Sequence, residues 1–211
     1  MKRLLLIVLP LLLIVGCSEV EGQQQLISDI TERYSNGNIQ SITYYKKTRD
    51  GIEKVKEEGY HYKGQKESEI HYKDGKEDGL STLWYENGQK RYEATYKNGK
   101  LDGLWTFWYV NGKKESEGTY KYGKEDGLWT EWYKNGRKKE ERTYKVGVED
   151  GLWTTYWYKT GKKHSEETYK NGKVDGIETY WYKNGQKEYE IDYKDLDPVG
   201  LCNAWYENGQ K

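Results

Sequence analysis

The side chains best suited to acid–base, nucleophilic or metal chemistry are scattered along this chain. Its three histidines, His61, His71 and His164, fall at unrelated positions of the repeating pattern described below. None of them lies near a Cys, Ser or Asp spacing that would build a metal site or an activated nucleophile. We therefore predict no catalytic site, no bound metal and no cofactor, and a function other than that of an enzyme.

Recurring Asp-Gly pairs raise the separate question of calcium binding. They include Asp102-Gly103, Asp126-Gly127 and Asp150-Gly151. A calcium loop needs several alternating oxygen ligands, which the residues around these pairs do not supply. Asp-Gly is also a common turn pair, because Gly tolerates a positive φ and Asp can bond to nearby backbone. We interpret these pairs as turns.

Cys17 is the residue for which the sequence predicts covalent chemistry. Lys2 and Arg3 precede an apolar run, residues 4–15, which has the length of a signal-peptide core and is too short to cross a bilayer as a helix. The run leads into Ile-Val-Gly before Cys17, and this ending resembles the cleavage and acylation motif of bacterial lipoproteins. That resemblance implies that Cys17 becomes the first mature residue and carries fatty acyl chains. Such a lipid anchor would hold the chain at a membrane of the bacterial cell envelope.

The composition indicates a folded protein without an ordinary hydrophobic core. Of the 211 residues, 34% are hydrophobic and 15% are aromatic, including 22 Tyr and 9 Trp. Large rings can bury roughly 150–250 Å² each, so they replace the missing aliphatic area. The 35 basic and 35 acidic side chains cancel. This balance argues against nucleic-acid binding, since proteins that bind nucleic acids carry a basic surface.

Glycines at a regular spacing divide most of the chain into repeats. Gly79, Gly103, Gly127, Gly151, Gly176 and Gly200 are separated by 24, 24, 24, 25 and 24 residues. In residues 128–136, a strand with alternating side chains leads into Asn135-Gly136, a pair typical of two-residue type I′ turns. Residues 138–144 are predicted to form the return strand. The extra residue within 154–157 predicts a β-bulge. These units predict an all-β chain of tandem hairpins.

Two-residue turns would place residues at equal distance from the turn opposite one another. One face of the sheet, the spine face, would then carry Leu104, Thr106 and Trp108 opposite Thr119, Glu117 and Glu115. Its Trp series is Trp84, Trp108, Trp132, Trp157, Trp181 and Trp205, and its Glu series is Glu69, Glu93, Glu117, Glu141, Glu166 and Glu190. We expect each Trp ring to pack on the Trp of the next unit and to stabilise the stack.

The opposite face, the patch face, combines repeated and variable residues. Its repeated members are Tyr85, Tyr109, Tyr133, Tyr158, Tyr182 and Tyr206, then Tyr72, Tyr96, Tyr120, Tyr144, Tyr169 and Tyr193, and Lys66, Lys90, Lys114, Lys138, Lys163 and Lys187. Two variable positions become aromatic in the middle units, where Trp105, Phe107, Trp129 and Trp153 are expected to form an apolar patch. Such a patch is typical of a partner-binding site. The alternative is that the rings only thicken a thin sheet.

The repeated pattern resembles a known family. The segments Gly-Leu-Trp-Thr-x-Trp-Tyr-x-Asn-Gly-x-Lys and Glu-x-Thr-Tyr-Lys-Asn-Gly-Lys-x-Asp-Gly recur in register between Tyr34 and Lys211. They are similar to the variant MORN repeat, found in bacterial proteins often labelled antitoxins of toxin–antitoxin modules. The resemblance implies an all-β fold in which hairpins stack into an elongated, single-layer, twisted antiparallel sheet. It also implies a role as a scaffold or binding surface.

These observations divide the chain into four parts. They are residues 1–16, a lipoprotein signal peptide; 17–25, the acylated cysteine and a polar tether; 26–78, degenerate amino-terminal repeats or a cap; and 79–211, the tandem repeats, the last of them incomplete. The unpaired strand edge at residues 201–206 predicts self-association. Cys202 is interpreted as a small apolar strand residue, with an intermolecular role as the alternative.

The favoured function is that of a membrane-anchored lipoprotein whose repeat sheet binds a protein partner. Two alternatives stay open. One is an antitoxin or immunity protein that neutralises a toxin. The other is a module that binds cell wall or glycan through its aromatic rings.

Overall fold

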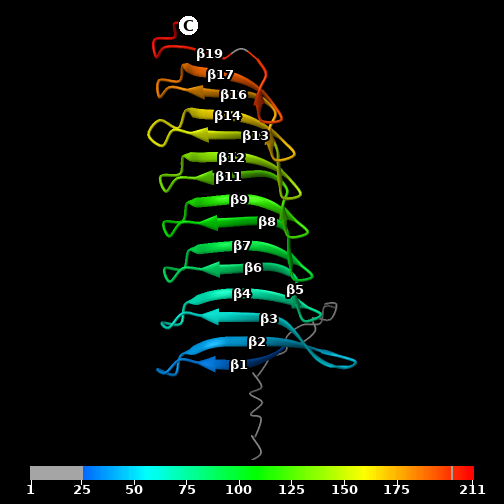
Figure 1. Cartoon of the computed structure of the whole chain (residues 1–211). Coiled ribbons are helices and arrows are strands. Elements are labelled where there is room, and N and C mark those ends of the chain that lie inside the picture. Colours follow the sequence, from blue (N-terminus) through cyan, green and yellow to red (C-terminus); the bar gives the residue numbers. More distant parts are fainter. Residues whose placement is uncertain (1–25, 201) are drawn as a thin grey trace, which may run out of the picture.

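The structure, a computed structural model, describes residues 26–200 and 202–211. These residues form strands and turns and no helix. Their 19 strands belong to one open antiparallel sheet, in which hairpins are stacked along the length of the molecule from β1 to β19 (Figure 1). The predicted all-β sheet of tandem hairpins is confirmed. Ala94 is the one fully buried hydrophobic residue within the described part, as expected for a sheet without an aliphatic core.

Each unit contributes an outgoing strand and a return strand. The outgoing strands are β1 (Ile27–Arg33), β3 (Gly51–Tyr60), β6 (Gly79–Trp84), β8 (Lys100–Trp108), β11 (Gly127–Trp132), β13 (Val148–Tyr156), β16 (Gly176–Trp181) and β19 (Asn203–Ala204). The return strands are β2 (Ile39–Thr48), β4 (Lys66–Lys73), β7 (Lys90–Lys97), β9 (Lys114–Lys121), β12 (Lys138–Lys145), β14 (Lys163–Lys170) and β17 (Lys187–Lys194). The short segments β5 (Lys76–Glu77), β10 (Lys124–Glu125), β15 (Lys173–Val174) and β18 (Asp197–Pro198) pair with the return strands that precede them.

The Asn135-Gly136 turn is not the predicted two-residue type I′ turn. Gly136 has a positive φ of 89°, whereas Asn135 does not. The Tyr133 N–H donates to the Arg137 carbonyl oxygen (2.8 Å), and the Gly136 N–H donates to that of Tyr133 (2.7 Å). These bonds define a three-residue loop, a type I turn closed by a left-handed Gly. Two-residue type I′ turns lie at the other end of the strands, as at Asn98-Gly99, where φ is 51° and 78°.

The three-residue loop shifts the strand register next to each turn. Leu104 faces Thr119, and Thr106 faces Glu117, as predicted, but Trp108 faces Lys114 instead of Glu115. The Lys series therefore lies on the spine face, and its predicted place on the patch face is wrong, because one bulged residue reverses the alternation of side chains. Each Lys forms an ion pair with the Glu three residues later: Lys66–Glu69, Lys90–Glu93, Lys114–Glu117, Lys138–Glu141, Lys163–Glu166 and Lys187–Glu190.

The Trp rings of the spine face do not pack on one another. Within the described residues no two rings of this series form a stacked or edge-on pair. Instead, Lys90 Nζ lies 5.8 Å from the ring centroid of Trp108, and Lys114 Nζ lies 5.8 Å from that of Trp132. The expected Trp-on-Trp packing is thus wrong, and a Lys of one unit covers the Trp of the next. The buried residues of the spine face include Thr82, Thr106, Thr130, Thr154 and Thr179, with Glu58 at the same position in β3, each at most 7% exposed.

The unit with the extra residue has a longer turn and no additional bulge in its strand. Its Trp157 N–H donates to the Lys162 carbonyl oxygen, and the Gly161 N–H donates to that of Trp157, both at 2.8 Å. Tyr156 pairs with Lys163 in the register that the other hairpins share. Tyr156 therefore takes the spine position assigned to Trp157, and Trp157 takes the position assigned to Tyr158.

A row of side-chain hydrogen bonds ties each unit to the next. The Tyr85 hydroxyl donates to the carbonyl oxygen of Trp108, and the Tyr109 hydroxyl donates to that of Trp132, both at 2.7 Å. The corresponding donors in other units are Tyr34, His61, Tyr133, Trp157 and Tyr182, at 2.8–3.2 Å from their acceptors. Phenol, imidazole and indole can share this position because each ends in an O–H or N–H group.

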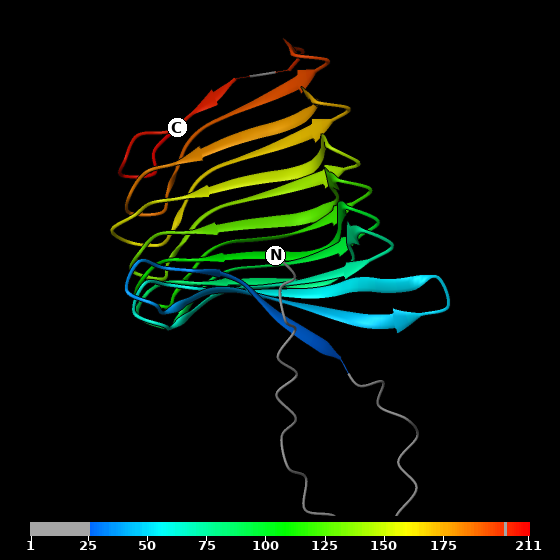
Figure 2. The ribbon, with the colours of Figure 1, turned by 90° about the horizontal axis from the view of Figure 1, so that it is seen from below.

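The Asp-Gly pairs do not form the predicted turns. Asp102 and Gly103 lie inside β8, where the pairing with β7 is interrupted and Gly103 has φ 129°. The Asp102 carboxylate accepts from the Tyr122 backbone N–H (3.3 Å) in the next unit's type I′ turn. Figure 2 shows that the strands are curved, and that the β2–β3 hairpin, which lacks an Asp-Gly pair inside its strands, extends beyond the others.

Several predictions concern the ends of the chain. Cys17, the signal peptide and the tether lie outside the described residues, as does residue 201. Cys202 is exposed and is not in a disulfide. The described residues include no helix long and apolar enough to cross a membrane. Self-association through the β19 edge stays a prediction.

Candidate functional site

Three of the four predicted patch residues come together on the patch face. The Trp105 ring centroid lies 6.2 Å from that of Phe107 on the same strand, β8, and 5.2 Å from that of Trp129 on β11. Tyr92, Tyr120 and Tyr144 of the return strands approach these rings edge-on at 5.1–6.4 Å. We call these six residues the aromatic patch. All six are partly exposed, so their ring surfaces are open to solvent or to a partner.

Small residues beneath the rings let the aromatic patch lie flat on the sheet. Ala94 and Gly118 both pair with Trp105, one on each side. A Cβ atom at Gly118 would lie 2.2 Å from Cε2 of Trp129, which shows that this ring occupies the space a side chain would need. The Trp129 Nε1–H also donates to the Thr119 carbonyl oxygen (3.2 Å). The position of Trp129 therefore depends on a glycine in the neighbouring strand.

Two of the patch tyrosines, Tyr92 and Tyr120, have a raised pKa. Burial raises the pKa of Tyr92, and the hydrogen bond to the Tyr96 hydroxyl (2.9 Å) adds to this effect. Burial also raises the pKa of Tyr120, with a further contribution from the negative charge of Glu125. At neutral pH these phenols are uncharged hydrogen-bonding groups beside the Trp rings.

Trp153, the fourth predicted patch residue, lies apart from the other three. Its ring centroid is 5.3 Å from that of Tyr169, and the Arg142 guanidinium stacks over it at 4.1 Å. Arg142 pairs with Trp129 on one side and with Trp153 on the other, so a charged group separates the two indoles. The apolar part of the patch ends at Trp129, and the Lys series predicted for this face lies on the spine face.

The three histidines lie at separate places in the structure. His71 Nδ1 is 2.6 Å from the Leu80 carbonyl oxygen, and His164 lies against Trp157, with ring centroids 4.1 Å apart. His61 belongs to the row of hydrogen bonds between units. The described part of the chain has no group of three or more His, Cys, Asp or Glu side chains placed to hold a metal ion.

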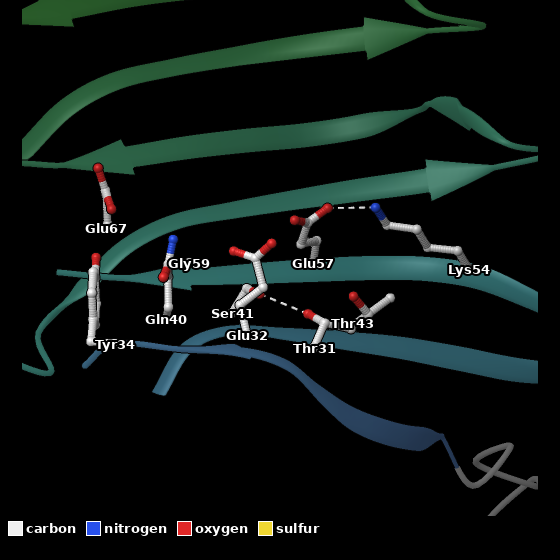
Figure 3. Close-up of a pocket in the computed structure, with 10 residues that line it drawn as sticks. All are labelled: Thr31, Glu32, Tyr34, Gln40, Ser41, Thr43, Lys54, Glu57, Gly59 and Glu67. Atoms are coloured by element: carbon white, nitrogen blue, oxygen red, sulfur yellow. Dashed lines mark hydrogen bonds and ion pairs between the residues drawn. The ribbon is translucent and has the colours of Figure 1, made fainter. Parts of the chain in front are cut away.

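A polar hollow opens at the amino-terminal end of the patch face (Figure 3). It has a volume of about 430 Å³ and is lined by Glu32, Ser41, Thr43, Glu57 and Gly59, among others. Gly59 stands at the register position that Leu83 and Phe107 fill in the next two outgoing strands. Hydroxyl and carboxylate groups surround the hollow, and the Ser68 side chain lies where a Cβ of residue 59 would be.

A comparison with protein families agrees with the repeat architecture. A family described as MORN repeat variant matches residues 30–47, 77–98, 101–122, 125–145, 149–171 and 174–195, which together exceed half of the chain. The chain belongs to the MORN repeat variant family. No curated protein matches it. MORN repeats are non-enzymatic modules that commonly mediate contacts with proteins or membranes.

One hairpin outside the matched segments resembles the matched hairpins in structure. The β3–β4 hairpin lies between the first two matches, yet it has the same build as the matched hairpins. Its His61 donates to the next unit as Tyr85 does, and the Gly64 N–H closes its turn on the His61 carbonyl oxygen (2.7 Å). This hairpin therefore shares its turn and its hydrogen bond to the next unit with the matched hairpins.

Sequence reasoning missed Arg142 and the small residues that seat the patch. A signal for them exists at one repeat position, the centre of each return strand, occupied by Ile70, Ala94, Gly118, Arg142, Glu167 and Ile191. Small residues appear at this position only beside the aromatic units, and Arg142 marks the point where the patch ends. The comparison of return strands in register would have found both features.

Proposed function

We propose that this chain is an interaction module that binds a protein partner through the aromatic patch. The observation that carries the proposal is the partly exposed set of Trp105, Phe107 and Trp129, seated on small residues in an otherwise regular sheet. Aromatic rings of this kind are enriched at the centres of protein interfaces, where a few of them supply most of the binding energy. The repeated spine supplies a rigid support for them.

We further propose that Cys17 carries the lipid that holds this module at the bacterial cell envelope. The basic start, the apolar run and the Gly before Cys17 support this anchor. We expect Cys17→Ala to abolish incorporation of an alkyne-tagged palmitate and to move the protein out of the membrane fraction. A Cys202→Ala variant is the matched control. Acyl labelling that persists in Cys17→Ala would refute the anchor.

The patch is tested by replacing Trp105 and Trp129 with Ser. A photoactivatable amino acid at Phe107 should crosslink a partner in cells, whereas the same group at Val110 on the nearby turn should do so less. The double Ser variant should weaken binding of the purified partner about 30-fold or more, the effect expected when interface Trp residues are truncated.

The control for this experiment is a variant with Leu104→Ser and Leu128→Ser. These leucines are 51% and 55% exposed and lie on the spine face. Thermal unfolding of all variants separates loss of binding from loss of fold. Equal affinity of the wild type and a folded Trp105→Ser, Trp129→Ser variant would exclude the patch as the binding surface.

The crosslinked molecule also decides between the narrower functions. A captured protein that is toxic when produced without this chain makes it an antitoxin or immunity protein. Capture of wall glycan instead of protein contradicts the proposal and favours the glycan-binding alternative.

A further inference from the structure

The charges of the two faces are arranged differently. On the spine face, the Lys and Glu series neutralise each other in repeated ion pairs, such as Lys114–Glu117 and Lys138–Glu141. Among the described residues, the patch face has single ion pairs, such as Lys139–Glu131 and Arg142–Glu140, and no such repeated series. The sequence is neutral overall, but the two faces differ in how their charged side chains are paired.

The patch face carries carboxylates that form no ion pair within the described residues. They are Glu77, Glu125, Glu149, Glu167 and Glu178. Glu77, Glu125 and Glu149 each pair across the sheet with a return-strand tyrosine, so they edge the row of tyrosines. All five carboxylates are partly exposed. The aromatic surface is thus bordered by carboxylates that have no ion-pair partner among the described residues, while Arg91 lies beside Phe107 with its guanidinium carbon 5.9 Å from the ring centroid.

Glu167 and Glu178 show this most clearly. Glu166 of β14 pairs with Thr179 of β16, so the register places Glu167 and Glu178 next to each other across the two strands. Burial raises the pKa of Glu178, and the negative charge of Glu167 adds to the effect. Like charges at neighbouring cross-strand positions are destabilising. A cation bound between these carboxylates would relieve their repulsion.

Arg142 shows how this face holds a guanidinium group. It stacks over the Trp153 ring at 4.1 Å and donates through Nη2 to Glu140 Oε1 at 2.9 Å. The two contacts combine a cation–π interaction with a charge-assisted hydrogen bond. The exposed rings of Trp105 and Trp129, with the unpaired carboxylates at their border, offer the same two kinds of contact to a group from outside.

The polar hollow places further carboxylates on the patch face, toward its amino-terminal end. Glu57 occupies the register position of Trp105 on its own strand, which places the hollow on the patch face. Lys54 bonds to Glu57, whereas Glu32 has no ion pair in the part of the chain described by the structure (Figure 3). Carboxylates therefore lie on the patch face at its amino-terminal end, and Glu167 and Glu178 lie beyond Arg142 toward its other end.

We propose that the partner segment bound by the patch face is basic and rich in arginine. This inference rests on the proposed function, because it names the chemistry of the partner for the same surface. Arginine fits better than lysine, since its planar guanidinium can stack on a ring and bond to a carboxylate at the same time. The unpaired carboxylates would repel an anionic partner such as a nucleic acid or an anionic lipid surface.

The proposal is tested with the full-length protein and a fluorescent peptide of alternating Arg and Thr. Peptides with Lys or Glu in place of Arg serve as comparisons. We expect the Arg peptide to bind most tightly, the Lys peptide less tightly and the Glu peptide least. The double variant Glu167→Gln, Glu178→Gln should bind the Arg peptide about 5- to 10-fold more weakly, the scale of lost charge-assisted contacts. Trp105→Ser with Trp129→Ser should also weaken it.

Glu93→Gln with Glu117→Gln is the matched control, because it removes the same net charge from the spine face. Equal weakening by both Gln pairs would overturn the proposal, since it would show attraction by net charge alone. So would equal binding of the Arg and Glu peptides. If the crosslinked partner depends on Trp105 and Trp129 but not on Glu167 and Glu178, the binding patch stands and the basic-segment inference fails.

Discussion

Replacing Glu58 by Gln is expected to lower the free energy of unfolding by about 3 kcal/mol, the lower end of the range for breaking a buried ion pair. Glu58 is 6% exposed. Its carboxylate accepts hydrogen bonds from the Tyr44 and Tyr60 hydroxyls, both at 2.7 Å, and from Lys56 and Lys66 Nζ, both at 2.9 Å. A neutral amide leaves two ammonium groups without this partner. The loss stays at the lower end because Lys66 also pairs with Glu69. Urea unfolding measures the change.

The same cluster predicts an acid-sensitive stability. Burial alone would raise the pKa of Glu58, but the hydrogen bonds from Lys66, Lys56 and the two tyrosines outweigh it and hold the pKa well below its ordinary value of 4.5. The folded state thus binds this proton less readily than the unfolded chain. The stability from Glu58 is complete above the ordinary pKa and is lost as the pH falls below it toward the lowered folded-state pKa.

Glu69→Gln is the control for both measurements. Glu69 also pairs with Lys66, but its side chain is 28% exposed, so we expect a loss below about 1 kcal/mol. In Glu58→Gln, the free energy of unfolding should fall less steeply as the pH is lowered below the ordinary Glu pKa. In Glu69→Gln, the steep fall should remain. The same loss of stability at low pH in Glu58→Gln as in the wild type would show that other carboxylates cause the acid sensitivity.

Replacing Gly118 by Ala is expected to destabilise the protein by about 1–3 kcal/mol, the usual cost of overpacking. The new Cβ would lie 2.2–2.7 Å from three ring atoms of Trp129. The ring must move, and it then loses its bond to the Thr119 carbonyl oxygen and its contact with Trp105. Gly118 has ordinary strand geometry and no positive φ. The penalty therefore comes from the ring and not from the backbone.

The sign of the effect should reverse when the Trp129 ring is absent. In a Trp129→Ser background the space above Gly118 is open, and Ala is favoured over Gly in a strand by roughly 0.5–1 kcal/mol through its lower backbone entropy. A double-mutant cycle of Gly118→Ala and Trp129→Ser measures this coupling. Additive effects of the two substitutions would contradict the contact between Gly118 and Trp129. Tryptophan fluorescence of Gly118→Ala should also shift, because the patch rings separate.

The repeat, the alternation of the strands and the all-β class follow from the amino-acid sequence alone. Those features depend on local patterns: glycines at fixed intervals, side chains alternating between two faces, and turn residues at the strand ends. The sequence also identified Trp105, Phe107 and Trp129 as neighbours, because residues at equal repeat positions stack in a hairpin array. The pairs Leu104–Thr119 and Thr106–Glu117 followed from the same counting.

The tertiary structure alone decided which side chains share a face near the turns. Whether Asn135-Gly136 closes a two- or three-residue loop depends on hydrogen bonds between the two strands, and one residue of difference moves Lys114 from the patch face to the spine face. The extra residue near Trp157 lies in a turn that is closed by backbone hydrogen bonds within its hairpin. Trp153 is separated from the patch because Arg142 of the adjacent strand stacks on its ring. These outcomes depend on hydrogen bonds and side-chain packing between strands, which the order of residue types does not specify.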